Sequence, residues 1–264
     1  MAASASGGNS ERDGRYFASL DHALSSVLAP WLVAPGRVVV LFSGGVDSGL
    51  LAWELRHHPR LVLFTIGTQG SSGLAVAKEA ANQLGLPGEV SEIDTRAVQG
   101  VVDQIRPELS DLGPTLRSVQ TSVAVALARA PEGQILCGQG IDELFLGYAH
   151  FRGLDSGEAG RRADADLVQL LDREWPRTLR IAKRLGRTVA APYLDPGFVA
   201  AARSIPLEYR QPSPNPKAVF RRWAVHRGLP PTIANRPKQA LQFGSGIDRI
   251  LAREQRRGWA SERD

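Results

Sequence analysis

The feature of this sequence that most constrains its fold is an alternation of short apolar runs with longer helical patterns between residues 36 and 137. The run Val38–Phe42 is apolar throughout, and Leu61–Ile66 is interrupted only by a threonine. Continuous runs of this kind are typical of strands buried on both faces of a parallel sheet. Strand–helix repetition therefore predicts an α/β fold, a doubly wound parallel sheet with helices on both faces. The predicted strands span 38–42, 61–66, 89–94 and 134–137, and the predicted helices span 48–57, 74–84, 98–105 and 116–130.

Breaks in this pattern divide the chain into three parts. They are an N-terminal tail with a lead helix, an α/β part, and a helical C-terminal lobe, at residues 1–35, 36–150 and 151–264. The small, polar residues 1–10 predict a tail, the apolar spacing over 16–28 predicts a helix, and Pro30 is expected to end that helix. In the third part the predicted helices span 165–171, 175–185, 198–204 and 217–226.

Composition and charge exclude several classes of protein. A hydrophobic share of 43% and a charged share of 22% are ordinary for a globular protein, so disorder is not expected. The single cysteine, Cys137, excludes an intramolecular disulfide and a four-cysteine zinc site, and the five histidines lack metal-ligand spacing. No signal-peptide core follows Met1, and no apolar run approaches the ~20 residues of a membrane helix, so we expect a cytoplasmic protein. The net charge of +5 and the pI near 9.8 come from scattered basic residues, which argue against a dedicated nucleic-acid surface.

Two loops at the carboxyl ends of predicted strands carry the residues best suited to chemistry. In Ser43–Ser48 (SGGVDS), glycines and the N–H groups of a helix start can cradle an anion, while Asp47 can hold magnesium. The lysine of the GxxxxGK[ST] phosphate loop is absent. After the fourth strand, Asp142 begins a helix and is expected to face the first loop, where two carboxylates could share the metal. The alternative interpretations are a tight strand–helix turn without a ligand and a plain helix N-cap at Asp142.

Both loops resemble segments of a known enzyme family. SGGVDS resembles the pyrophosphate-binding loop of the N-type ATP pyrophosphatases, or PP-loop superfamily. Gly138–Tyr148 (GQGIDELFLGY) resembles the GxGxDExFxGY signature of the synthetase domain of asparagine synthetases. Further segments agree in order and spacing across residues 36–250. They resemble the family's second-strand segment, its P(F/Y)LD motif, its KxxLR motif and its closing RxKxxxxxGxG element, at 64–71, 192–195, 217–221 and 236–246.

The resemblance implies an ATP-dependent carbon–nitrogen ligase that forms an amide. A substrate carboxylate would attack the α-phosphorus of ATP and release pyrophosphate, and ammonia or another amine would then attack the acyl-adenylate. The implied cofactors are ATP and Mg²⁺, with Asp47 and Asp142 as the magnesium ligands. The implied catalytic residues are Lys217, Asp47, Asp142 and Gln139, and the lysine neutralises charge on the departing pyrophosphate. The implied ATP and pyrophosphate contacts are Leu41, Ser43, Gly44, Gly45, Asp47, Ser48, Ile66 (against adenine), Cys137, Gly138 and Lys238.

Three positions depart from the family pattern. Asparagine synthetases carry an N-terminal glutaminase whose nucleophile is the cysteine after the initiator methionine, and here that residue is Ala2. Nitrogen is therefore expected from free ammonia, another amine or a separate glutaminase subunit. Gln139 replaces a glutamate, and an amide cannot act as a base, which leaves the identity of the carboxylate substrate open. Gly73 replaces an aspartate near the second-strand loop.

Other functions are compatible with parts of this pattern. A tRNA-modifying enzyme would keep the ATP chemistry and change the acceptor. A sulfur-transfer enzyme would use Cys137, although a lone cysteine at a strand end more often serves packing. A non-catalytic nucleotide-binding homologue would account for Gln139 and the missing glutaminase. The sequence allows a homo-oligomer and does not fix the oligomeric state.

Overall fold

The chain is built on one parallel sheet of five strands. The computed structural model describes residues 4–210, 215–237 and 244–256. The strands lie in the order β3-β2-β1-β4-β5, and every neighbouring pair is parallel. Their bounds are β1 Val38–Leu41, β2 Leu61–Gly67, β3 Gly88–Glu92, β4 Gln134–Leu136 and β5 Val189–Ala190. The predicted doubly wound α/β fold is confirmed.

Helical elements connect and follow the strands. The longer ones are α1 Ser4–Leu32, α2 Val46–Glu54, α3 Ser72–Leu84, α4 Thr95–Leu109, α5 Pro114–Arg129, α7 Ser156–Gln169, α8 Trp175–Arg184, α9 Pro196–Arg203, α11 Ala218–His226 and α14 Ile247–Arg256. The shorter ones are α6 Ile141–Leu144, η1 Ala149–Phe151, the π-helical η2 Leu170–Glu174, η3 Pro192–Leu194, α10 Leu207–Arg210 and α12 Pro231–Ala234.

The continuous apolar runs are explained by burial on both sides of the sheet. Val38 and Val40 of β1 contribute to one core cluster, and Val39 between them contributes to the other. All seven residues of β2 are buried. Because successive side chains of a strand point to opposite faces, a strand covered on both faces must be apolar at every position.

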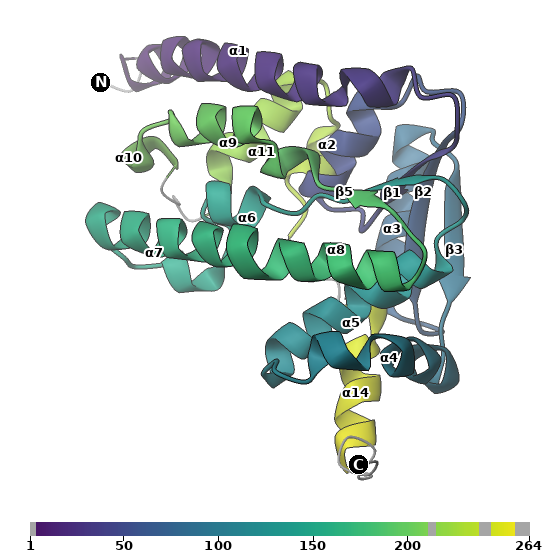
Figure 1. Ribbon diagram of the computed structural model, residues 1–264. Helices are drawn as coiled ribbons and strands as arrows, with labels where there is room; N and C mark the ends of the chain where they lie inside the picture. The colour runs from purple at the N-terminus through teal and green to yellow at the C-terminus, as the bar shows by residue number, and fades with distance from the viewer. Residues whose placement is uncertain (1–3, 211–214, 238–243, 257–264) are drawn as a thin grey trace.

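The two core clusters correspond to two layers of helices (Figure 1). Helices α1, α2, α3, α9 and α11 supply buried residues to the first cluster, and α4, α5, α8 and α14 supply them to the second. The first cluster joins residues from all three predicted parts of the chain, and β5, from the part predicted to be helical, pairs with β4. The division at residues 35 and 150 stays a prediction.

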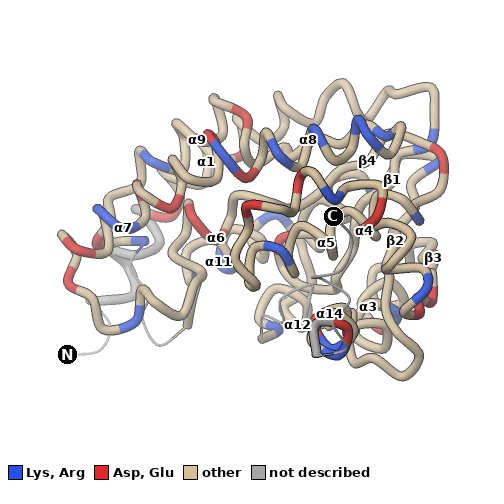
Figure 2. The backbone as a smooth tube through the Cα atoms, turned by 60° about the horizontal axis from the view of Figure 1, so that its bottom comes forward, with Lys and Arg blue, Asp and Glu red and all other residues tan. Residues whose placement is uncertain are grey.

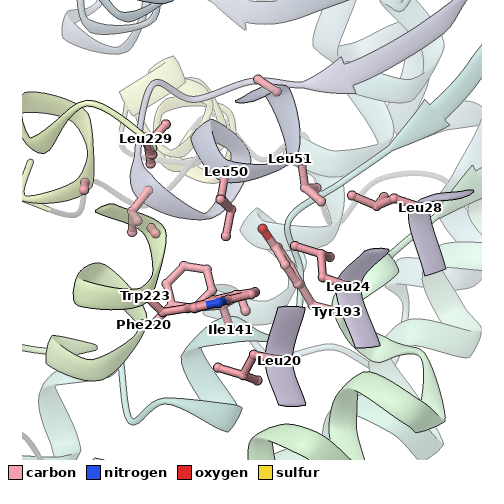
Figure 3. Packing of buried hydrophobic residues seen from close by; sticks show 14 of the residues in the cluster. Leu20, Leu24, Leu28, Leu50, Leu51, Ile141, Tyr193, Phe220, Trp223 and Leu229 are labelled. Carbon is pink, nitrogen blue, oxygen red and sulfur yellow. The ribbon is translucent and has the colours of Figure 1, made fainter. Parts of the chain in front are cut away.

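The N-terminal helix is longer than predicted. Helix α1 begins at Ser4, so the prediction of a tail over residues 1–10 is wrong from residue 4 onward, and Pro30 lies inside the last turn instead of ending the helix. At that position the missing N–H of proline removes one hydrogen bond of the helix. The packing of Leu20, Leu24 and Leu28 holds the helix, since each is at most 2% exposed and its burial contributes about 1.5–3 kcal/mol (Figure 3).

Other sequence predictions differ from the structure at element ends. Helix α2 spans 46–54 where 48–57 was predicted, and β3 spans 88–92 where 89–94 was predicted. Strand β5 was missed because two residues are too short for a periodic pattern. Within the described residues, no helix has the length and apolar character needed to cross a membrane.

Candidate active site

The candidate site lies where the strand order changes direction. After β1 the chain crosses to β2 and then to β3 on one side, whereas β4 returns to the opposite side of β1. In doubly wound sheets, ligands bind at this switch point, outside the carboxyl ends of the strands. The segment after β1 holds Ser43–Ser48, whose last three residues form the start of α2, and the loop after β4 holds Cys137–Gly140.

The β1–α2 loop is closed by its own serines. The Ser43 N–H donates to Ser48 Oγ at 3.1 Å, the two hydroxyl oxygens lie 3.2 Å apart, and the Gly45 N–H donates to Ser43 Oγ at 3.4 Å. Gly44 has a φ of +74°, and a Cβ there would lie 2.9 Å from the Val76 carbonyl oxygen. The N-cap residue of α2, Gly45, makes no side-chain capping bond, so the positive end of α2 is presented to the loop. This arrangement suits an anion.

The β4–α6 loop approaches the start of α2 so closely that a side chain at Gly138 would be tightly packed against it. A Cβ on Gly138 would lie 3.1 Å from Asp47 Cβ and 3.1 Å from the Ser48 nitrogen. Gly140 has a φ of +108°, which glycine adopts without steric cost. The Cys137 N–H donates to the Ala190 carbonyl at 2.9 Å, which ties this loop to β5. The predicted convergence of the two loops is therefore confirmed.

A buried lysine, Lys217, joins Asp47 and Asp142, the acidic residues in the first turns of α2 and α6. Lys217 Nζ lies 2.6 Å from Asp47 Oδ2 and 2.9 Å from Asp142 Oδ1, and the Lys217 side chain is 2% exposed. Burial alone would lower the pKa of Lys217, but the carboxylates of Asp142 and Asp47 outweigh burial and hold that pKa above its usual value. Lys217 is therefore a fixed positive charge at neutral pH, between two carboxylates that remain 23% and 16% exposed.

Hydrogen bonds from neighbouring residues hold the backbone of the Asp47–Lys217–Asp142 triad in place. The Tyr193 hydroxyl donates to the Asp47 carbonyl at 3.0 Å, and Tyr193 itself is buried among Leu24, Leu51 and Phe220 (Figure 3). The guanidinium of Arg221 donates to the carbonyls of Pro216, Ala234 and Arg236 and thereby fixes the start of α11, directly after Lys217.

The donor set fits a magnesium ion held together with phosphates. Both carboxylates contact the same lysine nitrogen, so a single cation can be reached by both. Among the described residues, no group of three or more His, Cys, Asp and Glu gathers as a protein-only metal site. Magnesium ordinarily takes one or two carboxylates and completes its shell with water and substrate phosphates. Asp47 and Asp142 are thus suited to that ion at the mouth of the anion-binding loop.

Comparison with known proteins agrees with this geometry. The model of the asparagine synthase family matches residues 19–186 and 166–263. The chain belongs to the asparagine synthase family. A protein of Methanocaldococcus jannaschii, named as a glutamine-hydrolysing asparagine synthetase, is 27% identical over 270 residues, covering 88% of this chain and 50% of that protein. The glutamine-hydrolysing asparagine synthetase of Mesocricetus auratus is 29% identical over 237 residues, covering 83% of this chain and 41% of the relative.

The chain thus spans about half the length of the curated relatives it matches. Among solved structures, the NMN synthetase of Francisella tularensis is similar at 13% identity and a TM-score of 0.42, covering 91% of this chain and 86% of that one.

The structure places most of the residues implied by the family together. Ser43, Gly44, Gly45, Asp47, Ser48, Gly138, Asp142 and Lys217 meet at the two loops described above. Leu41 ends β1 and is partly buried, whereas Ile66 is 2% exposed in the second core cluster, and its contact with adenine stays a prediction. Lys238 lies outside the described residues.

The departures from the family pattern have structural counterparts. A Cβ on Gly73 would lie 2.5 Å from the Gly244 carbonyl oxygen, so an aspartate does not fit at this position. Gln139 lies in the β4–α6 loop and is partly buried. Burial raises the pKa of the neighbouring Cys137 thiol to about 11, although a hydrogen bond from the Gln139 backbone lowers it somewhat.

Sequence reasoning missed three groups near the site. Tyr193 lies in the segment 192–195 that resembles the P(F/Y)LD motif, but no role was predicted for it. The Tyr148 hydroxyl donates to Glu143 Oε1 at 2.5 Å, and burial raises the pKa of that hydroxyl, as does the charge of Glu143. Gly147 contacts the triad itself. All three residues lie inside motifs that the sequence analysis identified. The motifs could therefore have drawn attention to these residues, but the contacts that each one makes are visible only in the structure.

Proposed function

We propose that this chain is an ATP-dependent ligase that activates a carboxylate as an acyl-adenylate and transfers it to ammonia or another amine. The observation that carries the proposal is the Asp47–Lys217–Asp142 triad, which lies at the glycine loop and the N-terminus of α2. The arrangement combines an anion cradle, a buried cation and two carboxylates at one sheet edge. Those are the groups required to bind and stabilise a departing pyrophosphate.

Each group in the site has a separate role in this reaction. The N–H groups of the β1–α2 loop and the Ser43 and Ser48 hydroxyls bind the β- and γ-phosphates of ATP. A substrate carboxylate oxygen attacks the α-phosphorus, the bond to the bridging oxygen breaks, and pyrophosphate leaves with its negative charge against Lys217. Bound magnesium, held by Asp47 and Asp142, would supply further charge neutralisation on the phosphates. The amine then attacks the acyl carbon, and AMP leaves with the bond electrons.

Gln139 bears on the second step. Because an amide cannot accept a proton from the attacking amine, the proton must leave by another route, such as solvent, a substrate group or the departing AMP phosphate. We infer that the nitrogen donor arrives as free ammonia or a small amine, or from a separate glutaminase subunit. Aspartate is the first carboxylate to test, since the relatives are named asparagine synthetases.

The rival functions draw less support from the structure. A thiol with a pKa of about 11 is protonated at neutral pH, which does not favour Cys137 as a sulfur carrier. Acidic residues accompany the basic ones along α7 (Figure 2), and several arginines of α8 and its flanks form ion pairs, namely Arg177, Arg180, Arg184 and Arg187. That pairing does not favour a nucleic-acid surface.

The proposal is tested by trapping the acyl-adenylate with hydroxylamine. Purified protein, Mg–ATP and aspartate should give aspartyl hydroxamate with one AMP and one pyrophosphate per hydroxamate. A panel of other carboxylates identifies the substrate if aspartate is inert. Asp47→Asn is the matched control, and we expect its rate to fall by about 100-fold or more, the scale of removing one stabilising group. ATP binding that yields no AMP with any carboxylate would contradict a ligase function.

A further inference from the structure

A second contact surface of the triad comes from the turn that follows α6. Leu146 and Gly147 lie between α6 and η1, and the Gly147 N–H donates to the Asp142 carbonyl at 2.8 Å. This bond ties the turn to the residue whose carboxylate contacts Lys217. The turn is also anchored from the other side, because Leu146 is fully buried and packs with Phe151, Ala159 and Ala163.

Gly147 lies against the side chains of both Asp142 and Lys217 and leaves no room for a side chain of its own. A Cβ at this position would lie 2.1 Å from Asp142 Oδ1 and 2.3 Å from Lys217 Cε. Both distances are far below the roughly 3.5–4.0 Å of favourable nonbonded contact. The backbone of Gly147 does not have a positive φ, so the cost of a side chain here comes from the close approach of Asp142 and Lys217 and not from backbone conformation.

Backbone strain is concentrated around the same contact. Among the described residues, the non-glycine residues with a positive φ are Leu146, at +53°, and Lys217, at +60°. Left-handed backbone is disfavoured for residues with a Cβ, and it persists where the surrounding structure imposes it. Lys217 bears the ammonium group, and Leu146 directly precedes Gly147, which lies against the lysine side chain. Both strained residues therefore bear on the position of a single side chain.

We propose that Gly147 is a positioning residue, whose lack of a side chain sets where the Lys217 ammonium and the Asp142 carboxylate lie. The inference rests on the proposed function for its kinetic consequence, but its geometric content is independent of that function. A methyl group at 147 must displace the lysine stem, the carboxylate, or both. A displacement on the order of 1 Å in a charge-stabilising group costs about 100-fold in rate.

The test compares Gly147→Ala with Gly100→Ala. Gly100 lies inside α4, also without a positive φ, and a Cβ there would meet nothing within 4 Å. Lysine acylation followed by mass spectrometry reports the position of Lys217 without reference to activity, and the exposed Lys78 and Lys183 serve as internal references. We expect Lys217 to be protected in the wild type and in Gly100→Ala and to be labelled several-fold faster in Gly147→Ala. Unchanged labelling of a folded Gly147→Ala protein would overturn the inference.

Kinetics then tests whether Gly147 acts through the lysine. Gly147→Ala should lower kcat by about 10- to 100-fold and change KM for ATP much less. In a Lys217→Ala background the same substitution should cause a clearly smaller further loss of activity, because only its collision with the Asp142 carboxylate remains. An additional loss of similar size in that background would contradict the inference.

Folding separates the remaining outcomes. If Gly147→Ala does not fold but Gly147→Ala/Lys217→Ala does, the collision is with the lysine and the inference stands. If neither folds, Gly147 serves the fold and not the lysine, and the inference fails. If the wild type makes no hydroxamate but labelling changes as expected, the proposed function fails and the positioning of Lys217 by Gly147 stands.

Discussion

Replacing Lys217 by methionine tests the electrostatics of the triad most sharply. Methionine keeps much of the length and volume of the buried side chain and removes its charge. Lys217 is 2% exposed and lies within 3 Å of both carboxylates, so the substitution leaves Asp47 and Asp142 facing each other without this cation. Breaking a buried pair by removing one partner costs about 3–5 kcal/mol. Because both carboxylates retain some contact with water, we expect the lower end, about 3 kcal/mol.

Urea unfolding followed by tryptophan fluorescence measures this difference. The control is Lys183→Met, since Lys183 is exposed on α8 and its replacement should change the free energy of unfolding by no more than about 0.5 kcal/mol. In thermal unfolding, a loss of about 3 kcal/mol corresponds to a fall in Tm of about 6–12 °C for a chain of this size.

The pH dependence of the difference has a defined sign. The pKa of Lys217 is raised in the folded protein, so its contribution is fully present below the unfolded-state pKa of about 10.4 and is lost as pH rises through the higher folded-state pKa. The stability difference between wild type and Lys217→Met should therefore be constant from about pH 6 to 9 and shrink only above about pH 10.5. Equal stability of Lys217→Met and Lys183→Met at pH 7 would refute the triad as a stabilising unit.

Three further predictions follow from the loops. Gly138→Ala should weaken ATP binding, measured by calorimetry, by about tenfold or more. The added Cβ would lie 3.1 Å from Asp47 Cβ and would force the loops apart. An affinity equal to that of the wild type would be inconsistent with this close approach. Cys137→Ser should retain turnover, and alkylation of Cys137 should be slow at pH 7 and rise toward pH 11, whereas fast labelling at pH 7 would count against a buried thiol. Gln139→Glu should raise the rate of amide formation with ammonia, read from product yield, if base strength limits the second step; a rate unchanged across pH 6–9 would show that it does not.

The sheet and the two loops could be predicted from sequence because their signals are local. Val38–Phe42 must be apolar throughout to lie between two helical layers, and the glycines after it mark a strand–helix turn. The position of Asp142 opposite Asp47 followed from a topological rule, since both residues come after strands whose carboxyl ends share an edge.

The features that the sequence did not predict depend on contacts between distant segments. Strand β5 is two residues long and exists because it pairs with β4. Helix α1 continues through Pro30 because its leucines are covered by other helices, which its own sequence does not reveal. In the sequence, Lys217 is recognisable only as the lysine of a motif. Its left-handed backbone and its proximity to Gly147 become visible only where the segments that carry Asp47, Asp142 and Lys217 meet.

The most direct test of the central claim is the identity of the nucleotide product. ³¹P NMR of the wild-type protein with Mg–ATP, the accepted carboxylate and ammonia should show AMP and pyrophosphate appearing in equal amounts, and Asp142→Asn should nearly abolish both. Release of ADP and inorganic phosphate would mean that the γ-phosphate is the reacting group, and it would contradict the assignment of the β1–α2 loop and Lys217 to a departing pyrophosphate.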